Sequence, residues 1–389
     1  MPVDRRKVLV LTGIKSEYDI LYPVIKELEK RNHNPLLVVS GAHLSNHHNY
    51  TYKRIIEDGF RISEKIDNLI STDRAIQRGI GIGLLIQGLS RTVERLSPDF
   101  IFVTGDREES LAAAIVGNYM NVIVVHKGGG DPVYGNSDDP VRFAVSKLAH
   151  IHCCNAMEHA KNLKQIGEED FRIFFTGHTI FKNIKDEKVI SLSKLKEIIG
   201  IKSDNYIVLM KHPLSSEIND SEFQMETTMS ALETFCEKTK YQVVYLPSNS
   251  DPGSFRMEQV ADKYKDKSWM LKLETLPRKL FINLMRNAKA LIGNSSMGII
   301  EAPFYKLPVI NIGNRQKGRI NAGNVQFVDY DVNEINEALK KATFDRNYID
   351  GLQEIRNPYG DDSAPSKIVD VIESVHLDEK KWYTKKKLC

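Results

Sequence analysis

Charged residues that could act in chemistry stand directly after short apolar runs. Asp106 and Arg107 follow the run FIFVTG (100–105), and Lys15 follows VLVLTG (8–13). An arginine can bind a diphosphate through paired hydrogen bonds, and a carboxylate beside it can transfer a proton. A lysine at the start of a helix can meet a phosphate. The competing interpretations are a structural ion pair and an ordinary solvated turn.

The stretch HKGGGDPVYGNSDD (126–139) contains three consecutive glycines and the carboxylates Asp131 and Asp138. Glycine has no side chain, so such a loop can pass close to a ligand. We therefore take both carboxylates as candidates for acid or base catalysis. A loop without function is the alternative.

Two segments of the second half also follow apolar runs. His212 stands in KHP (211–213), where a proline stiffens the turn, and is a candidate acid, base or diphosphate contact. In GNSSMGIIE (293–301), Ser295 and Ser296 would begin a helix whose N–H groups and hydroxyls converge on an anion. The simpler interpretation of a lone histidine after a strand is structural.

The same segment ends in Glu301, within one to two helical turns, which could bind a ribose diol. Arg315 and Arg319 follow the run LPVINIG (307–313) and would add positive charge nearby. Asn249 lies in the polar loop PSNSDPGS (247–254), for which turn chemistry alone is an adequate explanation.

Two other patterns have simpler explanations than a binding site. GIGIG (79–83) lacks the third spaced glycine of a dinucleotide-binding loop and continues as an apolar helix, which indicates helix packing. Cys153 and Cys154 lie near two histidines, but a buried strand IHCCN accounts for them better than a metal site does. We expect no metal.

Composition narrows the class of protein. The chain has 389 residues with 41% apolar content, which suggests about two domains. Lys and Arg number 54 against 51 Asp and Glu, so nothing indicates a nucleic-acid surface. The first apolar run is too short for a signal peptide or a membrane span, so we expect a cytoplasmic protein with no membrane partner.

The elements that must position these residues alternate between β-branched runs and helical patterns. This alternation predicts an α/β fold with parallel, doubly wound sheets. We expect a first domain at 1–180, a second at 181–375 and a basic tail at 376–389, with a linker around 178–204. Ligands of such sheets bind beyond the carboxyl ends of the strands, which predicts a cleft between the domains. The expected strands are 8–13, 35–41, 66–70, 100–106, 121–129, 149–155, 171–177, 206–212, 241–247, 268–273, 289–294, 307–313 and 324–329.

The chain resembles the hydrolysing UDP-N-acetylglucosamine 2-epimerases, which include the epimerase half of the bifunctional sialic acid enzyme of animals. The resemblance covers about residues 7–375. It rests on GDR (105–107), DDPVRFAVSKLAHIHCC (138–154), KHP (211–213), GNSS (293–296) and VINIGNRQKGR (309–319).

The resemblance implies a GT-B-like pair of Rossmann domains and conversion of UDP-GlcNAc to ManNAc and UDP, with no metal or nicotinamide cofactor. The expected path is anti elimination to a glycal, followed by hydration. It further implies a homodimer or tetramer formed mainly through the first domain. The matching positions assign Asp106 and Asp138 as catalytic carboxylates and Glu301 to the ribose. The other positions that match the UDP-binding set are Arg107, His212, Asn249, Ser295, Ser296 and Arg315.

The chain departs from the family at several positions. Where the family has His-x-Glu-Gly-Gly-Glu, this chain has HKGGGD, so Gly128 replaces a glutamate regarded as catalytic. Phe143 replaces a histidine, Lys182 replaces an acidic residue, and Lys15 replaces an arginine, which keeps the charge but loses the bidentate geometry.

Three explanations of the missing glutamate stay open. Asp131 or Asp138 takes its role, assisted by Lys127; the sugar differs, for example a 2,4-diacetamido-6-deoxy hexose; or catalysis is lost and a UDP-sugar-binding protein remains. A GT-B glycosyltransferase is a further alternative, although GDR and the GNSS-to-NRQ segment match the epimerases specifically.

Overall fold

The computed structural model describes residues 4–46, 49–70, 76–132, 138–247, 253–274 and 276–384, without the side chains of Asp138, Asp139 and Ser215. These residues form two compact units. The first contains the described residues up to Pro132, those from 138 to Asn183, and those from Tyr359 onward. The second contains the described residues of Ile184–Pro358.

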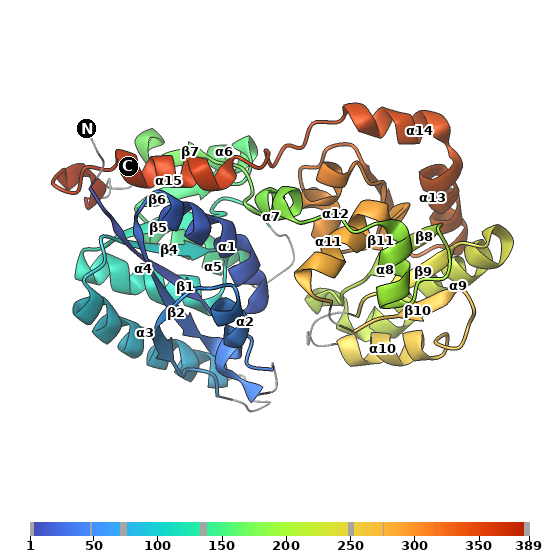
Figure 1. Cartoon of the computed structure of the whole chain (residues 1–389), viewed down its shortest axis with the longest axis horizontal. Helices are drawn as coiled ribbons and strands as arrows, with labels where there is room; N and C mark the ends of the chain where they lie inside the picture. Colours follow the sequence, from blue (N-terminus) through green and yellow to red (C-terminus); the bar gives the residue numbers. More distant parts are fainter. Residues whose placement is uncertain are drawn as a thin grey trace. The chain divides into compact units, whose positions relative to one another are not determined.

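The first unit is built on a parallel sheet with the strand order β3-β2-β1-β4-β5-β6-β7. Figure 1 labels its strands except β3. Its β-branched strands are mostly buried, as expected where helices cover both faces of a parallel sheet. The strands are β1 (Lys7–Thr12), β2 (Asn34–Ser40), β3 (Ile62–Ile66), β4 (Phe100–Thr104), β5 (Ile123–Lys127), β6 (Ile151–Cys154) and β7 (Ile173–Phe175).

Helices cover both faces of this sheet. Apolar side chains of α1 and α15 pack on one face, and those of α3, α4 and α5 pack on the other. The helices are α1 (Lys15–Lys30), α2 (Tyr52–Glu57), α3 (Ile76–Leu96), α4 (Glu108–Met120), α5 (Asp138–Leu148), α6 (Met157–Gln165), α7 (Ile180–Asp186), which runs on into the second unit, and α15 (Ala364–Ser374).

The second unit repeats the plan with the order β10-β9-β8-β11-β12-β13, again all parallel. Its strands are β8 (Tyr206–Met210), β9 (Gln242–Tyr245), β10 (Met270–Lys272), β11 (Ala290–Gly293), β12 (Val309–Ile312) and β13 (Val325–Val328). Its helices are α8 (Leu192–Ile199), α9 (Ser221–Thr239), α10 (Ser254–Asp262), α11 (Arg278–Asn287), α12 (Met297–Ile300), α13 (Val332–Phe344) and α14 (Arg346–Gly351).

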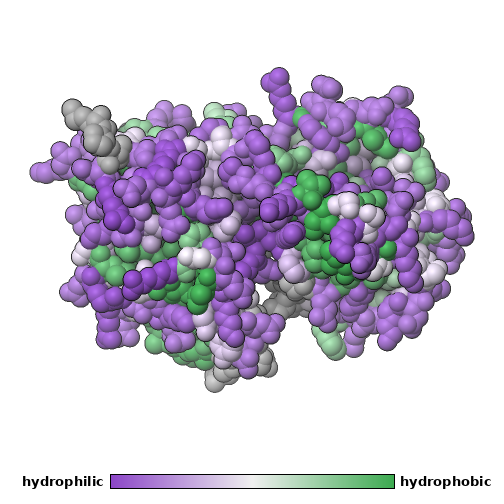
Figure 2. All heavy atoms as spheres, in the orientation of Figure 1, coloured by the Kyte–Doolittle hydropathy of each residue, from purple (hydrophilic) through white to green (hydrophobic). Residues whose placement is uncertain are grey.

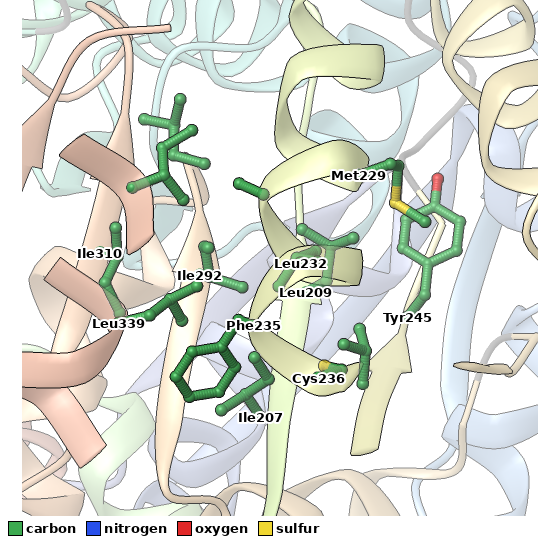
Figure 3. Packing of buried hydrophobic residues seen from close by; sticks show 14 of the residues in the cluster. Ile207, Leu209, Met229, Leu232, Phe235, Cys236, Tyr245, Ile292, Ile310 and Leu339 are labelled. Atoms are coloured by element: carbon green, nitrogen blue, oxygen red, sulfur yellow. The ribbon is translucent and has the colours of Figure 1, made fainter. Parts of the chain in front are cut away.

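Two apolar layers hold this second sheet. Figure 3 shows one of them, in which Leu232 and Phe235 of α9 and Leu339 of α13 meet Ile292 and Ile310 of the central strands. The layer on the other face is formed with α8 and α11. Short 3-10 helices complete the described chain: η1 (Gly41–Leu44), η3 (Asp170–Arg172), η4 (Ser215–Asp220), η5 (Ala302–Tyr305), η6 (Leu352–Glu354) and η7 (Lys380–Trp382).

The end of the chain differs from the expected domain plan. The change of unit between Asn183 and Ile184 lies three residues beyond the expected boundary, but the chain returns to the first unit at Tyr359. The reason is α15, whose buried face joins the apolar layer of α1. Residues 359–375 therefore belong to the first unit.

The segment after α15, expected as a basic tail, packs against the first unit through part of its described length. Trp382 is 5% exposed and packs in the same layer. The fully buried Arg172 donates to the carbonyls of Lys381, Trp382 (3.1 Å) and Thr384 (2.8 Å). One guanidinium thus fixes the segment to the body of the first unit.

Two smaller expectations also change. Residues 178–204, expected as a linker with a short helical pattern, contain the two helices α7 and α8. The third strand is Ile62–Ile66 rather than 66–70. Its three central residues are polar and only its last residue is buried, which suits the edge position that it occupies. Asn68 lies beyond the strand and accepts the Gly41 N–H at 2.8 Å.

Within the described residues, no helix combines the length and apolar character needed to cross a membrane.

Candidate active site

In each unit, the strand order reverses at one point, and ligands of doubly wound sheets bind beyond the carboxyl ends of the strands there. In the first unit this point lies between β1 and β4, and in the second between β8 and β11. The segments that the sequence singled out follow these strands.

After β1, the chain turns at Gly13 into α1, which Lys15 opens. The turn is closed from within, because the Glu17 carboxylate accepts the Gly13 N–H at 2.8 Å. A Cβ built on Gly13 would lie 1.8 Å from Oε1 of Glu109, so a larger residue here would displace the Glu109 side chain. Lys15 is half-buried at the start of the helix.

After β4, Asp106 binds the guanidinium of Arg142, which reaches it from α5. A second nitrogen of Arg142 donates to the Gly128 carbonyl at 3.1 Å. Arg142 therefore joins the ends of β4 and β5. The carboxylate of Asp106 keeps 20% of its surface exposed, so it can meet a ligand while the arginine fixes its orientation.

Arg107 lies among carboxylates of its own helix. Its Nε is 3.4 Å from Glu109, and its Nη2 is 3.6 Å from Glu108. Burial lowers the pKa of Arg107, but Glu109 and Glu17 outweigh that effect and raise it. Burial, together with repulsion from Glu109, raises the pKa of Glu17 well above its ordinary value. The turns after β1 and β4 thus hold two buried carboxyls, those of Glu17 and Glu109, close to Arg107.

The conformation of the glycine loop (128–130) accounts for a glycine at position 128, where the family has a glutamate. Gly128 has φ +82°, a left-handed conformation that side chains disfavour. A Cβ built there would lie 3.3 Å from the Asn155 amide nitrogen and 3.9 Å from Nη1 of Arg142. A glutamate at this position would require a different loop conformation.

The side chain of Asp131 is buried beneath the glycine loop and is hardly exposed to solvent. It is 4% exposed, and its carboxylate is 3.4 Å from Nε2 of His159 and 3.8 Å from Nη1 of Arg142. These contacts make Asp131 an anchor for Arg142. Asp138 is the first residue of α5, and its side chain lies outside the description.

Lys127 is the last residue of β5 and is 1% exposed. Its ammonium contacts the Asn155 side-chain oxygen, and burial lowers its pKa to about 8. On the other face of the strand, Nε2 of His126 is 2.8 Å from the Gly105 carbonyl. Burial lowers the pKa of His126 to about 3, so this histidine is neutral at pH 7.

In the second unit, His212 follows β8. Burial first, and then the positive charges of Arg315 and Lys211, lower the pKa of His212 to about 3. The neutral imidazole can donate one hydrogen bond but cannot act as an acid at pH 7 in the structure as it stands. Lys211 is fully buried, with its ammonium 4.6 Å from the ring centre of Tyr330.

Ser295 and Ser296 follow β11 as expected, but the helix that they open is short. α12 spans only Met297–Ile300 and continues as η5. A helix this short has a weak dipole, so an anion at this position would depend mainly on the N–H groups and hydroxyls. Glu301 lies between the two helical segments and is half-buried.

The two arginines after β12 differ in their surroundings. Arg315 donates to the Asn294 carbonyl at 2.9 Å, beside His212. Arg319 is 8% exposed and donates to Oε1 of Gln316 at 2.9 Å. It therefore helps to hold Gln316, which in turn donates to the Asn294 carbonyl. Asn249 lies outside the described residues.

The sequence did not single out two residues that organise these groups. Arg142 binds Asp106, and Asn294 binds both His212 and Arg315. Both lie inside the segments that carried the resemblance, DDPVRFAVSKLAHIHCC and GNSS. Arg142 is 36 positions from Asp106 along the chain, and Asn294 is 82 positions from His212. Only the fold brings these pairs together.

Two Rossmann-like domains, each with a parallel sheet and polar groups beyond the strand ends at its switch point, define the GT-B-like fold class. Residues 26–373 match the family UDP-N-acetylglucosamine 2-epimerase, and the chain belongs to this family.

Curated relatives agree with this assignment. The chain is 32% identical to the GDP/UDP-N,N'-diacetylbacillosamine 2-epimerase (hydrolyzing) of Campylobacter jejuni, over 87% of this chain and 88% of that protein. It is 30% identical to the UDP-N,N'-diacetylbacillosamine 2-epimerase (hydrolyzing) of Legionella pneumophila, over 96% and 97% of the two chains. These relatives support an enzyme of the UDP-sugar 2-epimerase class.

A solved structure confirms the fold. The UDP-GlcNAc 2-epimerase of Neisseria meningitidis bound to UDP-GlcNAc superposes with a TM-score of 0.81 at 19% identity, covering 94% of this chain and 99% of that one.

Proposed function

We propose that the protein is a hydrolysing 2-epimerase that converts UDP-GlcNAc, or a related UDP-2-acetamido sugar, into a free ManNAc-type sugar and UDP. Membership of the family supports the reaction class. The observation that carries the proposal is Asp106, a partly exposed carboxylate at a strand end whose orientation Arg142 fixes.

The reaction has two balanced stages. A base removes the C2 proton while the C1–O bond breaks and its electron pair leaves with UDP, which forms a C1–C2 double bond. Water then adds its oxygen to C1, and a proton reaches C2 from the opposite face. C2–H is a weak acid, so the C1–O bond must break early. Positively charged groups that stabilise the negative charge on the departing diphosphate therefore lower the barrier to elimination.

The proposed roles follow from position. Asp106, with Asp138, serves proton transfer at the sugar, and Asp131 acts through Arg142. His212, Ser295, Ser296 and Arg315 bind the diphosphate, and Glu301 binds the ribose. The other proposed UDP contacts are Lys15, Arg107, Asn249 and Arg319.

Incubation with UDP-GlcNAc in deuterated water, followed by NMR, tests the proposal. We expect release of UDP together with ManNAc that carries deuterium at C2. UDP binding without turnover would indicate a UDP-sugar-binding protein instead. Transfer of the sugar to an acceptor without exchange at C2 would indicate a glycosyltransferase.

A second substrate is favoured by a specific observation. Both relatives named above are described as diacetylbacillosamine 2-epimerases, and both are at least 30% identical to this chain. A UDP-2,4-diacetamido-6-deoxy hexose is therefore the alternative substrate. A comparison of kcat/KM for this sugar and for UDP-GlcNAc on the same enzyme preparation decides between them.

We also propose that the protein is a homodimer formed through the first unit. What supports this is an apolar stripe on α3, where Ile76, Ile80 and Leu84 are 56%, 47% and 41% exposed. Gly79 and Gly83 lie in the same region, with open space around their Cβ positions. The hydropathy surface in Figure 2 includes apolar areas on the first unit. Exposed apolar stripes commonly mark protein interfaces.

Light scattering coupled to size-exclusion chromatography checks this proposal. We expect twice the chain mass for the unchanged protein and one chain mass for Ile80→Asp. Ile198→Asp, at an exposed isoleucine of α8 in the second unit, is the matched control and should stay dimeric. A monomeric unchanged protein, or a dimeric Ile80→Asp variant, would contradict the proposal.

A further inference from the structure

Asn294 connects the strand ends at the switch point of the second unit. Its N–H donates to the Met210 carbonyl at 3.1 Å, which continues the pairing of β11 with β8 by one residue. The close approach depends on Gly293, whose φ is +132° and whose built Cβ would lie 2.0 Å from that carbonyl. Asn294 itself is 2% exposed.

The side chain of Asn294 extends the connection to His212. Its Oδ1 accepts the His212 N–H at 2.7 Å, and its Nδ2 donates to the His212 carbonyl at 2.8 Å. Just after β8 ends, the side-chain amide of Asn294 thus makes the two backbone hydrogen bonds that a neighbouring strand would otherwise make with His212. Only a side chain with one acceptor and one donor can satisfy both backbone groups.

The backbone carbonyl of Asn294 faces the third strand end. It accepts from Nη1 of Arg315 at 2.9 Å and from Nε2 of Gln316 at 3.1 Å. Gln316 is 1% exposed and also binds Arg319. Asn294 follows β11 directly and is hydrogen-bonded to residues that follow β8 and β12. This one buried residue therefore connects three strand ends.

We propose that Asn294 is a positioning residue that holds His212 and Arg315 in one arrangement, so that both bind the diphosphate of the nucleotide. The inference rests on the proposed function for the identity of the ligand. Groups held in place before binding lose less conformational freedom when the ligand arrives. Asn294 therefore contributes to affinity for the diphosphate and not to affinity for the nucleoside.

Calorimetric titration of the full-length protein with UDP and with uridine tests the inference. Asn294→Ala removes the two side-chain hydrogen bonds to His212 and keeps the backbone carbonyl that accepts from Arg315. We expect this variant to bind UDP about 10- to 100-fold more weakly, as is typical when buried hydrogen bonds are lost. Uridine affinity should change by less than about threefold, because the affected groups meet only the diphosphate. Asn336→Ala is the matched control, since Asn336 is a buried asparagine that bonds within α13.

A conservative variant guards against misfolding. Asn294→Asp keeps the size and the acceptor but loses the donor unless the carboxyl is protonated. Relative to the unchanged protein at the same pH, its UDP affinity should recover as the pH falls from 8 toward 5, because protonation restores a donor.

The outcomes separate the inference from the proposed function. Unchanged UDP affinity in Asn294→Ala, or equal losses for UDP and uridine, would overturn the inference while leaving the epimerase proposal intact. Failure of the unchanged protein to bind UDP would overturn both. A selective loss for UDP supports the inference even if the deuterium experiment shows no turnover.

Discussion

For single residues, the contact between Asp106 and Arg142 matters most for the proposed chemistry. The guanidinium binds the carboxylate and the Gly128 carbonyl, so it holds Asp106 in one orientation. The Asp131 carboxylate lies 3.8 Å from Nη1 of the arginine and 3.4 Å from Nε2 of His159. At Gly128 the chain therefore offers only its backbone, and the carbonyl of this residue accepts from Arg142.

Replacement of Asp106 by asparagine should separate catalysis from binding. The amide keeps the shape and an acceptor for Arg142 but cannot take a proton. We expect kcat to fall by about 10²- to 10⁴-fold, with UDP affinity within several-fold of the unchanged enzyme. Rates of UDP release and a UDP titration measure the two effects. An active Asp106→Asn enzyme would contradict the catalytic assignment.

Sequence reasoning predicted the position, after a strand, of residues whose place follows from a strand end. Asp106 and Lys15 stand directly after apolar runs, and such runs fix where the chain turns at the sheet edge. Arg142 and Asn294 could not be assigned their roles in this way, because each acts on a partner that only the folded sheet brings near. The buried environment of Asp131 was equally invisible, since it depends on α6 and α5.

Among elements, the interaction of the C-terminal segment with η3 is the least expected. A basic run such as KKWYTKKK is typical of a solvated tail, yet Trp382 is buried and Arg172 binds three of the nearby carbonyls. The hydrogen bonds run to the backbone, which any sequence provides. Residue types alone therefore do not reveal this docking.

Arg172→Lys should release this segment. Lysine keeps the charge but cannot reach several carbonyls with a planar fork, so buried acceptors lose their donors. We expect the first unit to lose about 2–4 kcal/mol of stability and residues 376–384 to exchange amide hydrogens faster. Hydrogen exchange followed by mass spectrometry measures both effects. Arg91→Lys, at an exposed position of α3, is the control and should change neither.

For the whole molecule, buried histidines make stability depend on pH. Burial lowers the pKa of His43 to about 4 and the pKa values of His126 and His212 to about 3. Between pH 6.5 and about 4, the unfolded chain binds protons at these positions and the folded chain does not. Stability contributed by the neutral histidines is therefore lost as pH falls. Glu17 and Glu109, whose pKa values burial raises, act in the opposite direction.

His126→Gln isolates one of these contributions. Glutamine stays neutral in both states, so the free energy of unfolding should fall less steeply with decreasing pH, by about 1.4 kcal/mol per pH unit. Urea unfolding between pH 4.5 and 6.5 measures the slope. His376→Gln, at an exposed position, should leave it unchanged. Equal slopes for His126→Gln and the unchanged protein would contradict the explanation.

The return of the chain to the first unit at Tyr359 has a consequence for biosynthesis. The layer that α1 and α15 share contains residues from both ends of the sequence. While the ribosome is still making the second unit, α1 has emerged without its helical partner, and its apolar face is uncovered. The second unit can complete its fold as soon as its own strands have emerged. The part of the protein that is translated first is thus the last to become complete, and the nascent chain must stay soluble through that interval.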